Sequence, residues 1–310
     1  MSIIENALKK AGKQGLVIDG DNSEIQTKQP ENVDPAVFGY EDSIKDELDG
    51  IASNGRSRFV EDKQVVINWS KLAESGFLDN NNTASLMAEE FRVIKRPLVN
   101  NIQDAKNNRI ERANLILVSS SVEGEGKTFI SINLALSLAN ERDKKILLID
   151  ADVERPSLSR QLDIKRSPGL IEFLEDESIG FSDIILKTDH PNLSIIPAGK
   201  RHKYSTELLS SQRMRTFTHE ISDRYPDRIV IFDSPPLLAA TQGHVLSELV
   251  GQVVLVISAE STPQSLVAEA IAKLANCDVV MTLLNKTRKD FNLTAGYGYG
   301  YGYGYGKYGA

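Results

Sequence analysis

A glycine-containing loop with the residues for phosphate binding occupies positions 119–128, where the sequence reads SSSVEGEGKT. The apolar run Leu115–Val118 precedes the loop, and a helical stretch, Thr128–Asn140, follows it. Backbone N–H groups of such a loop can surround phosphate oxygens, and the helix N-terminus adds a favourable dipole. Lys127 would reach the β- and γ-phosphates, and Thr128 would place its hydroxyl on Mg²⁺. The candidate nucleotide contacts in this loop are Val122, Glu123, Gly124, Glu125, Gly126, Lys127, Thr128 and Phe129.

Carboxylates follow two further apolar runs that have the length of strands. Ile146–Ile149 leads into Asp150 and Asp152, and Ile229–Phe232 leads into Asp233, which two prolines follow. A lone aspartate at such a place is more often a helix cap or part of a turn. Three runs that each deliver a suitable group to a strand end favour a shared site, because Mg²⁺ prefers hard oxygen ligands together with phosphates and waters. We therefore predict a metal site made by Thr128, Asp152 and Asp233.

The elements that must position these groups alternate between strand and helix from Asn114 onward. The strand-length apolar runs are Leu115–Val118, Lys145–Ile149, Leu193–Ile196, Ile229–Phe232, Val253–Ile257 and Val279–Leu284. Strands that are apolar on both faces, with helical segments between them, indicate a parallel sheet covered by helices on both faces. Ligands of such sheets bind at the carboxyl ends of the strands. The predicted fold class is α/β, a P-loop NTPase-type parallel sheet flanked by helices.

Three regions follow from the changes in composition along the chain: an N-terminal region (1–82), a P-loop domain (83–291) and a Tyr-Gly tail (292–310). The first region begins with Ser2–Ala11, either a frayed helix or an amphipathic helix that docks on a partner or membrane surface. The polar segment Gly12–Asp62 is typical of a largely disordered linker. A small ordered segment, with Trp69 as its anchor, should follow. A helix is expected from Thr83, and Pro97 leaves its far end open.

The composition excludes several classes of protein. The chain has 310 residues and carries 36 Lys and Arg against 43 Asp and Glu, a net charge of −7. This acidic balance argues against a general nucleic-acid binder. We find no apolar run of the roughly 18 residues that a membrane helix needs and no apolar core of a secretion signal. A single cysteine, Cys277, excludes a disulfide framework and fits a reducing compartment, so we expect a cytoplasmic protein.

Taken together, the motifs resemble those of the bacterial tyrosine kinase family, the P-loop autokinases of polysaccharide synthesis and export. The family's GEGK[ST] ending, its DxDxR motif and its DxPP motif correspond to Gly124–Thr128, Asp150–Asp152 and Asp233–Pro236. Its ExxRxxR oligomerisation motif corresponds to Glu89, Arg92 and Lys95. The N-terminal start and the sequence KRPL suggest the exosortase-associated subgroup.

Three positions differ from these motifs. Ser121 stands where the full phosphate-loop pattern has its first glycine, a substitution that the family accepts. Glu154 stands where DxDxR has its arginine, and Arg155 follows one place later. Lys95 replaces the last arginine of ExxRxxR, which keeps the charge but loses the bidentate geometry.

The resemblance implies an ATP- and Mg²⁺-dependent enzyme that phosphorylates tyrosines in trans within a ring-like oligomer, in which Glu89, Arg92 and Lys95 lie at the interface. It places Asn285 against the adenine. It also implies a membrane activator of the chain-length-determinant type, which recruits the protein to the inner membrane, and a tyrosine phosphatase.

The Tyr-Gly tail supplies the expected phosphate acceptors. These are Tyr297, Tyr299, Tyr301, Tyr303, Tyr305 and Tyr308. Alternating glycines favour a flexible segment over a strand. Asp150 is the expected acceptor of the tyrosine hydroxyl proton. By itself such a tail is more typical of a self-associating low-complexity segment.

Two alternatives compete with the kinase. One is a partitioning or positioning ATPase of the same fold, whose additional loop lysine would fall at Val122. The other is a nucleotide-gated scaffold whose tail binds itself or glycan. Fold alone does not decide among them.

Overall fold

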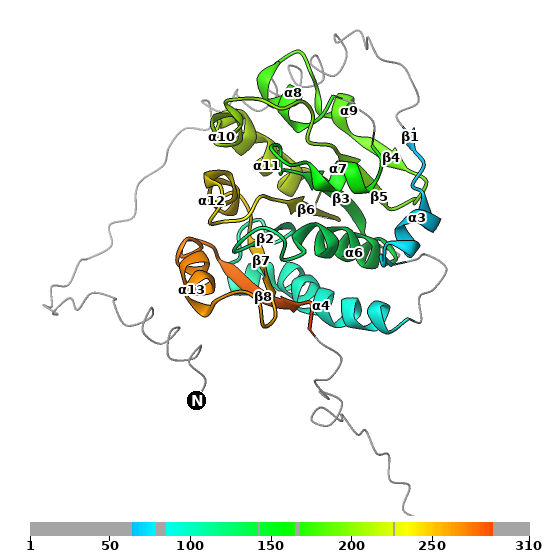
Figure 1. Ribbon diagram of the computed structural model, residues 1–310. Helices are drawn as coiled ribbons and strands as arrows, with labels where there is room; N and C mark the ends of the chain where they lie inside the picture. The colour runs from blue at the N-terminus through cyan, green and yellow to red at the C-terminus, as the bar shows by residue number, and fades with distance from the viewer. Residues whose placement is uncertain (1–63, 79–84, 142, 165–167, 226, 288–310) are drawn as a thin grey trace, which may run out of the picture. The chain divides into compact units, whose positions relative to one another are not determined.

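The computed structural model describes residues 64–78, 85–141, 143–164, 168–225 and 227–287. The predicted helix Ser2–Ala11, the polar linker and the Tyr-Gly tail lie outside these residues. The described part is built on one eight-stranded sheet with the order β1-β4-β5-β3-β6-β2-β7-β8 (Figure 1).

The six strands predicted from apolar runs are present, extended by one or two residues at some ends. They are β2 (Leu115–Ser120), β3 (Lys145–Asp150), β5 (Leu193–Ile196), β6 (Arg228–Asp233), β7 (Gln252–Ser258) and β8 (Val279–Asn285). They pair in parallel throughout, with β2 between β6 and β7 and with β3 between β5 and β6. The parallel core of the sheet is therefore confirmed.

Two short strands were not predicted. These are β1 (Gln64–Val65) and β4 (Leu186–Thr188). β4 runs antiparallel to β5, so the outer part of the sheet is mixed and not purely parallel as expected. Runs of two or three residues carry no periodic pattern that could distinguish them from loops.

Helices cover both faces of the sheet, as predicted. They are α3 (Trp69–Glu74), α4 (Leu86–Gln103), α5 (Ala105–Asn108), α6 (Lys127–Ala139), α7 (Ser157–Gln161), α8 (Leu170–Glu175), α9 (Phe181–Ile184), α10 (Ser205–Leu209), α11 (Gln212–Arg224), α12 (Thr241–Ser247) and α13 (Gln264–Ala272). Alternate residues of β2 enter separate cores: Ile116 packs with α4 and α6, and Leu117 packs with α8, α11 and α13. Figure 1 shows α4 and α6 together on one side of the sheet.

Helix α4 continues through Pro97 to Gln103, which settles its far end. The Ser85 hydroxyl caps the helix by accepting a hydrogen bond from the Ala88 N–H at 3.2 Å. Phe91 and Leu98 are buried two helical turns apart and pack toward α6. This apolar stripe holds the helix in place across the proline, which removes only one backbone donor.

The segment 64–78 is fastened to the same sheet. Trp69 Nε1 donates to Asp189 Oδ2 at 2.6 Å, which confirms the predicted anchor. At the far end of the segment, the Leu78 N–H donates to Asn133 Oδ1 at 2.7 Å. The Phe77 ring lies 5.1 Å from the ring of Phe129, centroid to centroid. The segment therefore supports α6 just behind the phosphate loop.

Candidate functional site

The predicted phosphate loop connects β2 to α6 at the carboxyl end of the sheet. Its turn uses positive φ angles at Gly124 (+80°) and Gly126 (+98°), which side chains rarely tolerate. A Cβ at Gly126 would also lie 2.1 Å from Asn285 Nδ2. Helix α6 begins at Lys127, so its free N-terminal N–H groups face the end of the loop. Loop and helix end together have the form of an anion site.

Glu125 holds this loop in shape from inside. Its side chain is only 2% exposed, and Oε2 accepts a hydrogen bond from the Val122 N–H at 2.8 Å. Oε1 accepts from the Ser258 N–H at 3.1 Å and from the Thr262 hydroxyl. We predicted Glu125 as a nucleotide contact, and the structure places its carboxylate within the protein. Two of its partners, Ser258 and Thr262, lie more than 130 residues away in the chain, so no sequence pattern could have indicated them.

We predict that Glu125→Gln loosens the loop. The glutamine amide keeps one acceptor oxygen, but its NH₂ group faces donors that the second carboxylate oxygen accepted. Those buried donors lose their acceptor, which should lower the free energy of unfolding by about 1–3 kcal/mol. We expect a matching loss of thermal stability and about tenfold weaker nucleotide binding, measured by melting curves and calorimetry. Glu177→Gln is the control, since that side chain is exposed and lies outside the site, between α8 and α9. Unchanged nucleotide affinity in Glu125→Gln would contradict this role.

Four of the predicted site residues meet in two polar pairs at the end of the loop. Lys127 Nζ contacts Asp152 Oδ2 at 2.8 Å, and the Thr128 hydroxyl donates to Asp233 Oδ2 at 2.8 Å. The Ser131 hydroxyl, which we did not predict, donates to Asp233 Oδ1 at 2.9 Å. The strand ends of β3 and β6 thus meet the loop as expected.

For both Lys127 and Asp233, burial shifts the pKa in one direction and neighbouring opposite charges shift it in the other. Burial lowers the pKa of Lys127, but the carboxylates of Asp233 and Asp152 outweigh it and hold the pKa above its usual value. Burial raises the pKa of Asp233, opposed by Lys127 and by the hydroxyl of Thr128. Lys127 is therefore a charged group at neutral pH, which phosphate binding requires.

Asp150 lies beneath these pairs, fully buried beside Asp233 in the register of β3 and β6. Its Oδ2 accepts from the N–H and the hydroxyl of Ser159 at 2.9 and 2.6 Å. Its Oδ1 finds no hydrogen-bond partner among the described residues. Burial, and next the charge of Asp233, raise the pKa of Asp150 to about 7. Asp150 is thus a carboxylate with the basicity of an imidazole.

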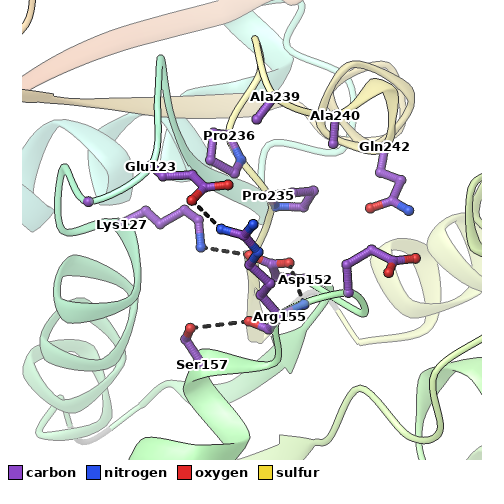
Figure 2. Close-up of a pocket in the computed structure, with 12 residues that line it drawn as sticks. Glu123, Lys127, Asp152, Arg155, Ser157, Pro235, Pro236, Ala239, Ala240 and Gln242 are labelled. Carbon is purple, nitrogen blue, oxygen red and sulfur yellow. Dashed lines mark hydrogen bonds and ion pairs between the residues drawn. The ribbon is translucent and has the colours of Figure 1, made fainter.

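A cavity of about 400 Å³ opens in front of the loop (Figure 2). It is lined by Glu123, Gly124, Lys127, Asp152, Glu154, Arg155, Ser157, Pro235, Pro236, Ala239, Ala240 and Gln242. Asp152 lines it, whereas Asp150 lies behind the wall. Arg155, one place after the motif position, also lines the cavity: its guanidinium pairs with Glu123, and its backbone N–H donates to Asp152 Oδ1 at 3.1 Å.

The remaining predicted nucleotide contacts support the loop from outside. Asn285 Nδ2 donates to the Glu125 carbonyl at 2.8 Å. Beside it, Lys286, which we did not predict, donates from Nζ to the Gly124 carbonyl at 2.6 Å. The ring of Phe129 packs on Phe77, so only its backbone faces the loop end. Asn285 is thus placed beside the loop, where a contact to the base of a nucleotide stays a prediction.

The three predicted interface residues lie along α4. Glu89 and Arg92 form an ion pair one turn apart, with side chains 60% and 47% exposed. Lys95 Nζ instead contacts Glu141 Oε1 at 2.9 Å and the Ser137 carbonyl at 2.8 Å in the same chain. Lys95 therefore has partners of its own, and Glu89 with Arg92 presents the accessible part of the motif.

The metal site predicted here consists of one hydroxyl and carboxylates, without a complete ligand shell from the protein. Within the described ranges, no group of three or more His, Cys, Asp or Glu side chains could hold a metal ion. Thr128, Asp152 and Asp233 do bring hard oxygens to the loop end. Such a partial set suits Mg²⁺, which keeps waters and takes phosphate oxygens as further ligands.

Comparison with known proteins shows the family. Residues 113–287, more than half of the chain, match the AAA domain family. The tyrosine-protein kinase YwqD of Bacillus subtilis is 32% identical over 193 residues, which cover 62% of this chain and 77% of that protein. The chain belongs to the AAA domain family by this match, and it belongs to the bacterial tyrosine kinases by its similarity to YwqD.

Other members of the family agree with the fold of this kinase. The BceF tyrosine kinase domain is 30% identical in sequence, with a TM-score of 0.57 over 69% of this chain and 86% of that domain. The kinase domain of the Escherichia coli tyrosine kinase ETK has a TM-score of 0.58 at 23% identity, over 77% of this chain and 93% of that domain, and supports the fold alone.

The match to one further relative is partial. The tyrosine-protein kinase ptk of Acinetobacter johnsonii is 34% identical over 170 residues, which cover 55% of this chain but only 22% of that protein. In the described part of this kinase, every helix is too short or too polar to cross a membrane.

Proposed function

We propose that this chain is an ATP- and Mg²⁺-dependent protein-tyrosine autokinase whose acceptors are the tail tyrosines, Tyr297 to Tyr308, and that it regulates exopolysaccharide polymerisation and export. The observation that carries the proposal is the pairing of Lys127 with Asp152 and of Thr128 with Asp233 at the phosphate loop. That pairing brings a cation for phosphate and oxygens for a metal ion together at the end of the loop, where Lys127 and Asp152 line the cavity.

Phosphoryl transfer depends on positioning and charge more than on covalent chemistry by the enzyme. Lys127 and the N–H groups of the loop end would bind the β- and γ-phosphates. Bound Mg²⁺, held by Thr128, Asp233 and Asp152, would neutralise developing charge on the phosphates. Phosphate oxygens would compete with Asp152 for Lys127, so nucleotide entry would loosen the Lys127–Asp152 pair.

Asp150 is the proposed acceptor of the tyrosine hydroxyl proton. Its Oδ1 has a free lone pair in the described structure, and its pKa of about 7 is high for a carboxyl group. A base is most effective when its pKa lies near the working pH. The phenol oxygen forms the bond to the γ-phosphorus as the bond to the ADP oxygen breaks, and the phenol proton passes to Oδ1.

Partners and location are part of the proposal. Similar proteins carry names from capsule and exopolysaccharide systems, such as the kinase from the cps region of Klebsiella pneumoniae. We infer a cytoplasmic kinase that a membrane activator of the chain-length-determinant type recruits to the inner membrane, with a tyrosine phosphatase as its antagonist. Trans phosphorylation would occur in a ring whose interface includes Glu89, Arg92 and Lys95.

Phosphotyrosine mass spectrometry tests this function. The full chain is incubated with ATP and Mg²⁺, and phosphate release is measured in parallel. A kinase produces phosphopeptides from the tail. An ATPase of the partitioning type releases phosphate without them, and a scaffold does neither. Either of the last two results would contradict the proposal.

We predict that replacing all six tail tyrosines by Phe stabilises the oligomer in the presence of ATP. Each phosphate adds about −1.5 to −2 charges, so a modified tail repels its neighbours. The unmodified chain should dissociate during incubation, and the sixfold variant should not, as followed by light scattering. Tyr225→Phe, outside the tail, is the control. Equal dissociation and equal phosphate incorporation in both proteins would refute the link.

A further inference from the structure

The cavity wall contains a buried side-chain amide whose oxygen has no hydrogen-bond partner among the described residues. Gln242, at the start of α12, is 5% exposed. Its Nε2 donates to the Ser205 hydroxyl oxygen at 2.7 Å, whereas Oε1 is buried without a hydrogen bond to any described residue. Native proteins leave few such atoms unpaired, because each costs about 1–3 kcal/mol. A ligand of the cavity is the natural partner.

The orientation of this amide is fixed by its neighbours. The Ser205 hydroxyl donates its only proton to Glu154 Oε1 at 2.9 Å, so it can only accept from Gln242. A flipped amide would place two acceptor oxygens against each other. Nε2 therefore faces Ser205 and Oε1 faces the cavity, as Figure 2 shows for the side chain that points from α12 toward Pro235.

The two hydrogen bonds that link Gln242, Ser205 and Glu154 also give Glu154 a role. Glu154 replaces the arginine of the DxDxR motif, and its carboxylate fixes the proton of Ser205. An arginine has no acceptor and could not do so. The glutamate at the arginine position of the motif is thus what orients the amide of Gln242, through Ser205.

The surroundings of Oε1 determine which ligand group it suits. The cavity wall beside Gln242 consists of Pro235, Pro236, Ala239 and Ala240, while Lys127 and Gly124 line the part that belongs to the phosphate loop. A carbonyl oxygen repels phosphate, so Oε1 belongs to the subsite of a neutral donor. Small apolar side chains allow a peptide backbone to approach closely, and every tyrosine from Tyr297 to Tyr305 has glycine on both sides.

We propose that Gln242 is a specificity-determining residue that accepts a hydrogen bond from the backbone N–H of a glycine beside the acceptor tyrosine. The inference rests on the proposed function, because it names how the tyrosine-bearing segment is held. Glycine allows the approach of the backbone to the Pro and Ala wall, and a larger residue at that position would be excluded by it.

A double substitution, one in the enzyme and one in the peptide, tests this contact. The enzyme is the full chain with its six tail tyrosines replaced by Phe. The peptide copies residues 297–308 with Tyr303 as its only tyrosine, and two further peptides carry N-methylglycine in place of Gly302 or Gly304. We expect Gln242→Met to raise the KM for the parent peptide about 5- to 10-fold, with the KM for ATP unchanged.

The coupling between the two changes is the decisive result. With intact Gln242, the KM of one of the N-methylated peptides should exceed that of the parent peptide by about the same factor. With Gln242→Met, the KM of that peptide should not rise further above that of the parent peptide. Ser205→Ala, which frees the amide to flip, should give a smaller increase in KM. Thr241→Ala, on the exposed side of the same helix, is the matched control and should leave all values unchanged.

Failure of the inference and failure of the function give different results. If the enzyme with Gln242 transfers no phosphate to the parent peptide, the proposed function fails. In that case, calorimetry with ADP present measures the affinity for the parent and N-methylated peptides, and the intact enzyme is again compared with Gln242→Met. Equal affinity of Gln242→Met and the intact enzyme for the parent peptide overturns the inference, in binding as in turnover.

Discussion

Lys127→Met should abolish phosphorylation of the tail tyrosines, with a loss of about 10²- to 10³-fold. Lys127 is the cation of the phosphate loop, and its Nζ lies 2.8 Å from Asp152 at the cavity wall. Removing one preorganised charge-stabilising donor from a phosphoryl-transfer site costs about 3–4 kcal/mol of barrier. Phosphotyrosine incorporation per chain, measured by mass spectrometry over time, gives the factor directly.

The same substitution has a second effect that must be separated from the first. Asp152 and Asp233 lose the cation that compensates their buried charge, so Lys127→Met should also be less stable. Lys127→Arg keeps the charge and should fold normally, yet its wide planar head should not fit the loop, with at least tenfold lower labelling. Lys145→Met, at the opposite end of β3, is the control. Full labelling by a folded Lys127→Arg or Lys127→Met protein would refute the site.

The parallel core of this sheet could be predicted because its strands are apolar on both faces. Leu115 and Ile116 need separate cores, which only a sheet between two helical layers offers. Once β2, β3 and β6 are parallel neighbours, their carboxyl ends must meet, and so must Lys127, Asp152 and Asp233. The location of the site could therefore be predicted from the parallel arrangement of these strands, and no single motif would have been enough.

The antiparallel strand β4 and the partners of the site residues could not be predicted. Ser159 reaches Asp150 because α7 folds back over the strand end, and Ser258 reaches Glu125 from the end of the neighbouring strand β7. Such contacts depend on how loops close in three dimensions, and no periodicity encodes them. The exosortase-associated subgroup likewise stays a prediction from sequence.

Gln242 shows why a polar residue in a helix is hard to interpret from sequence. Thr241–Ser247 has no motif, and glutamine is common on helix surfaces. Only the hydrogen bond from Nε2 to Ser205 shows that its other half faces the cavity unpaired. Chain-specific recognition can thus lie in residues outside the motifs that define the family.

Asp150→Asn should make the protein more stable at pH 8 while it removes most of the kinase activity. The pKa of Asp150 is raised from 3.8 to about 7, so between these values the folded state holds a proton that the unfolded state releases. Stability from this group is therefore present at low pH and is lost as pH rises toward 8. Three pKa units set an upper limit of about 4 kcal/mol.

The asparagine variant keeps the contact to Ser159 and carries no charge beside Asp233, so the stability difference from the unmodified protein should grow from pH 5 to pH 8. We expect about 1–3 kcal/mol at pH 8, from denaturant unfolding, and about 10²-fold lower phosphotyrosine formation, since the proton acceptor is lost. Asp143→Asn, on the exposed surface, should change neither. A variant that is less stable at pH 8 than at pH 5, relative to the unmodified protein, would show that Asp150 is not held at raised pKa. On the proposed mechanism, the protein loses folding free energy as pH rises from about 4 to about 7, and in return it holds a carboxylate base with a pKa near the working pH.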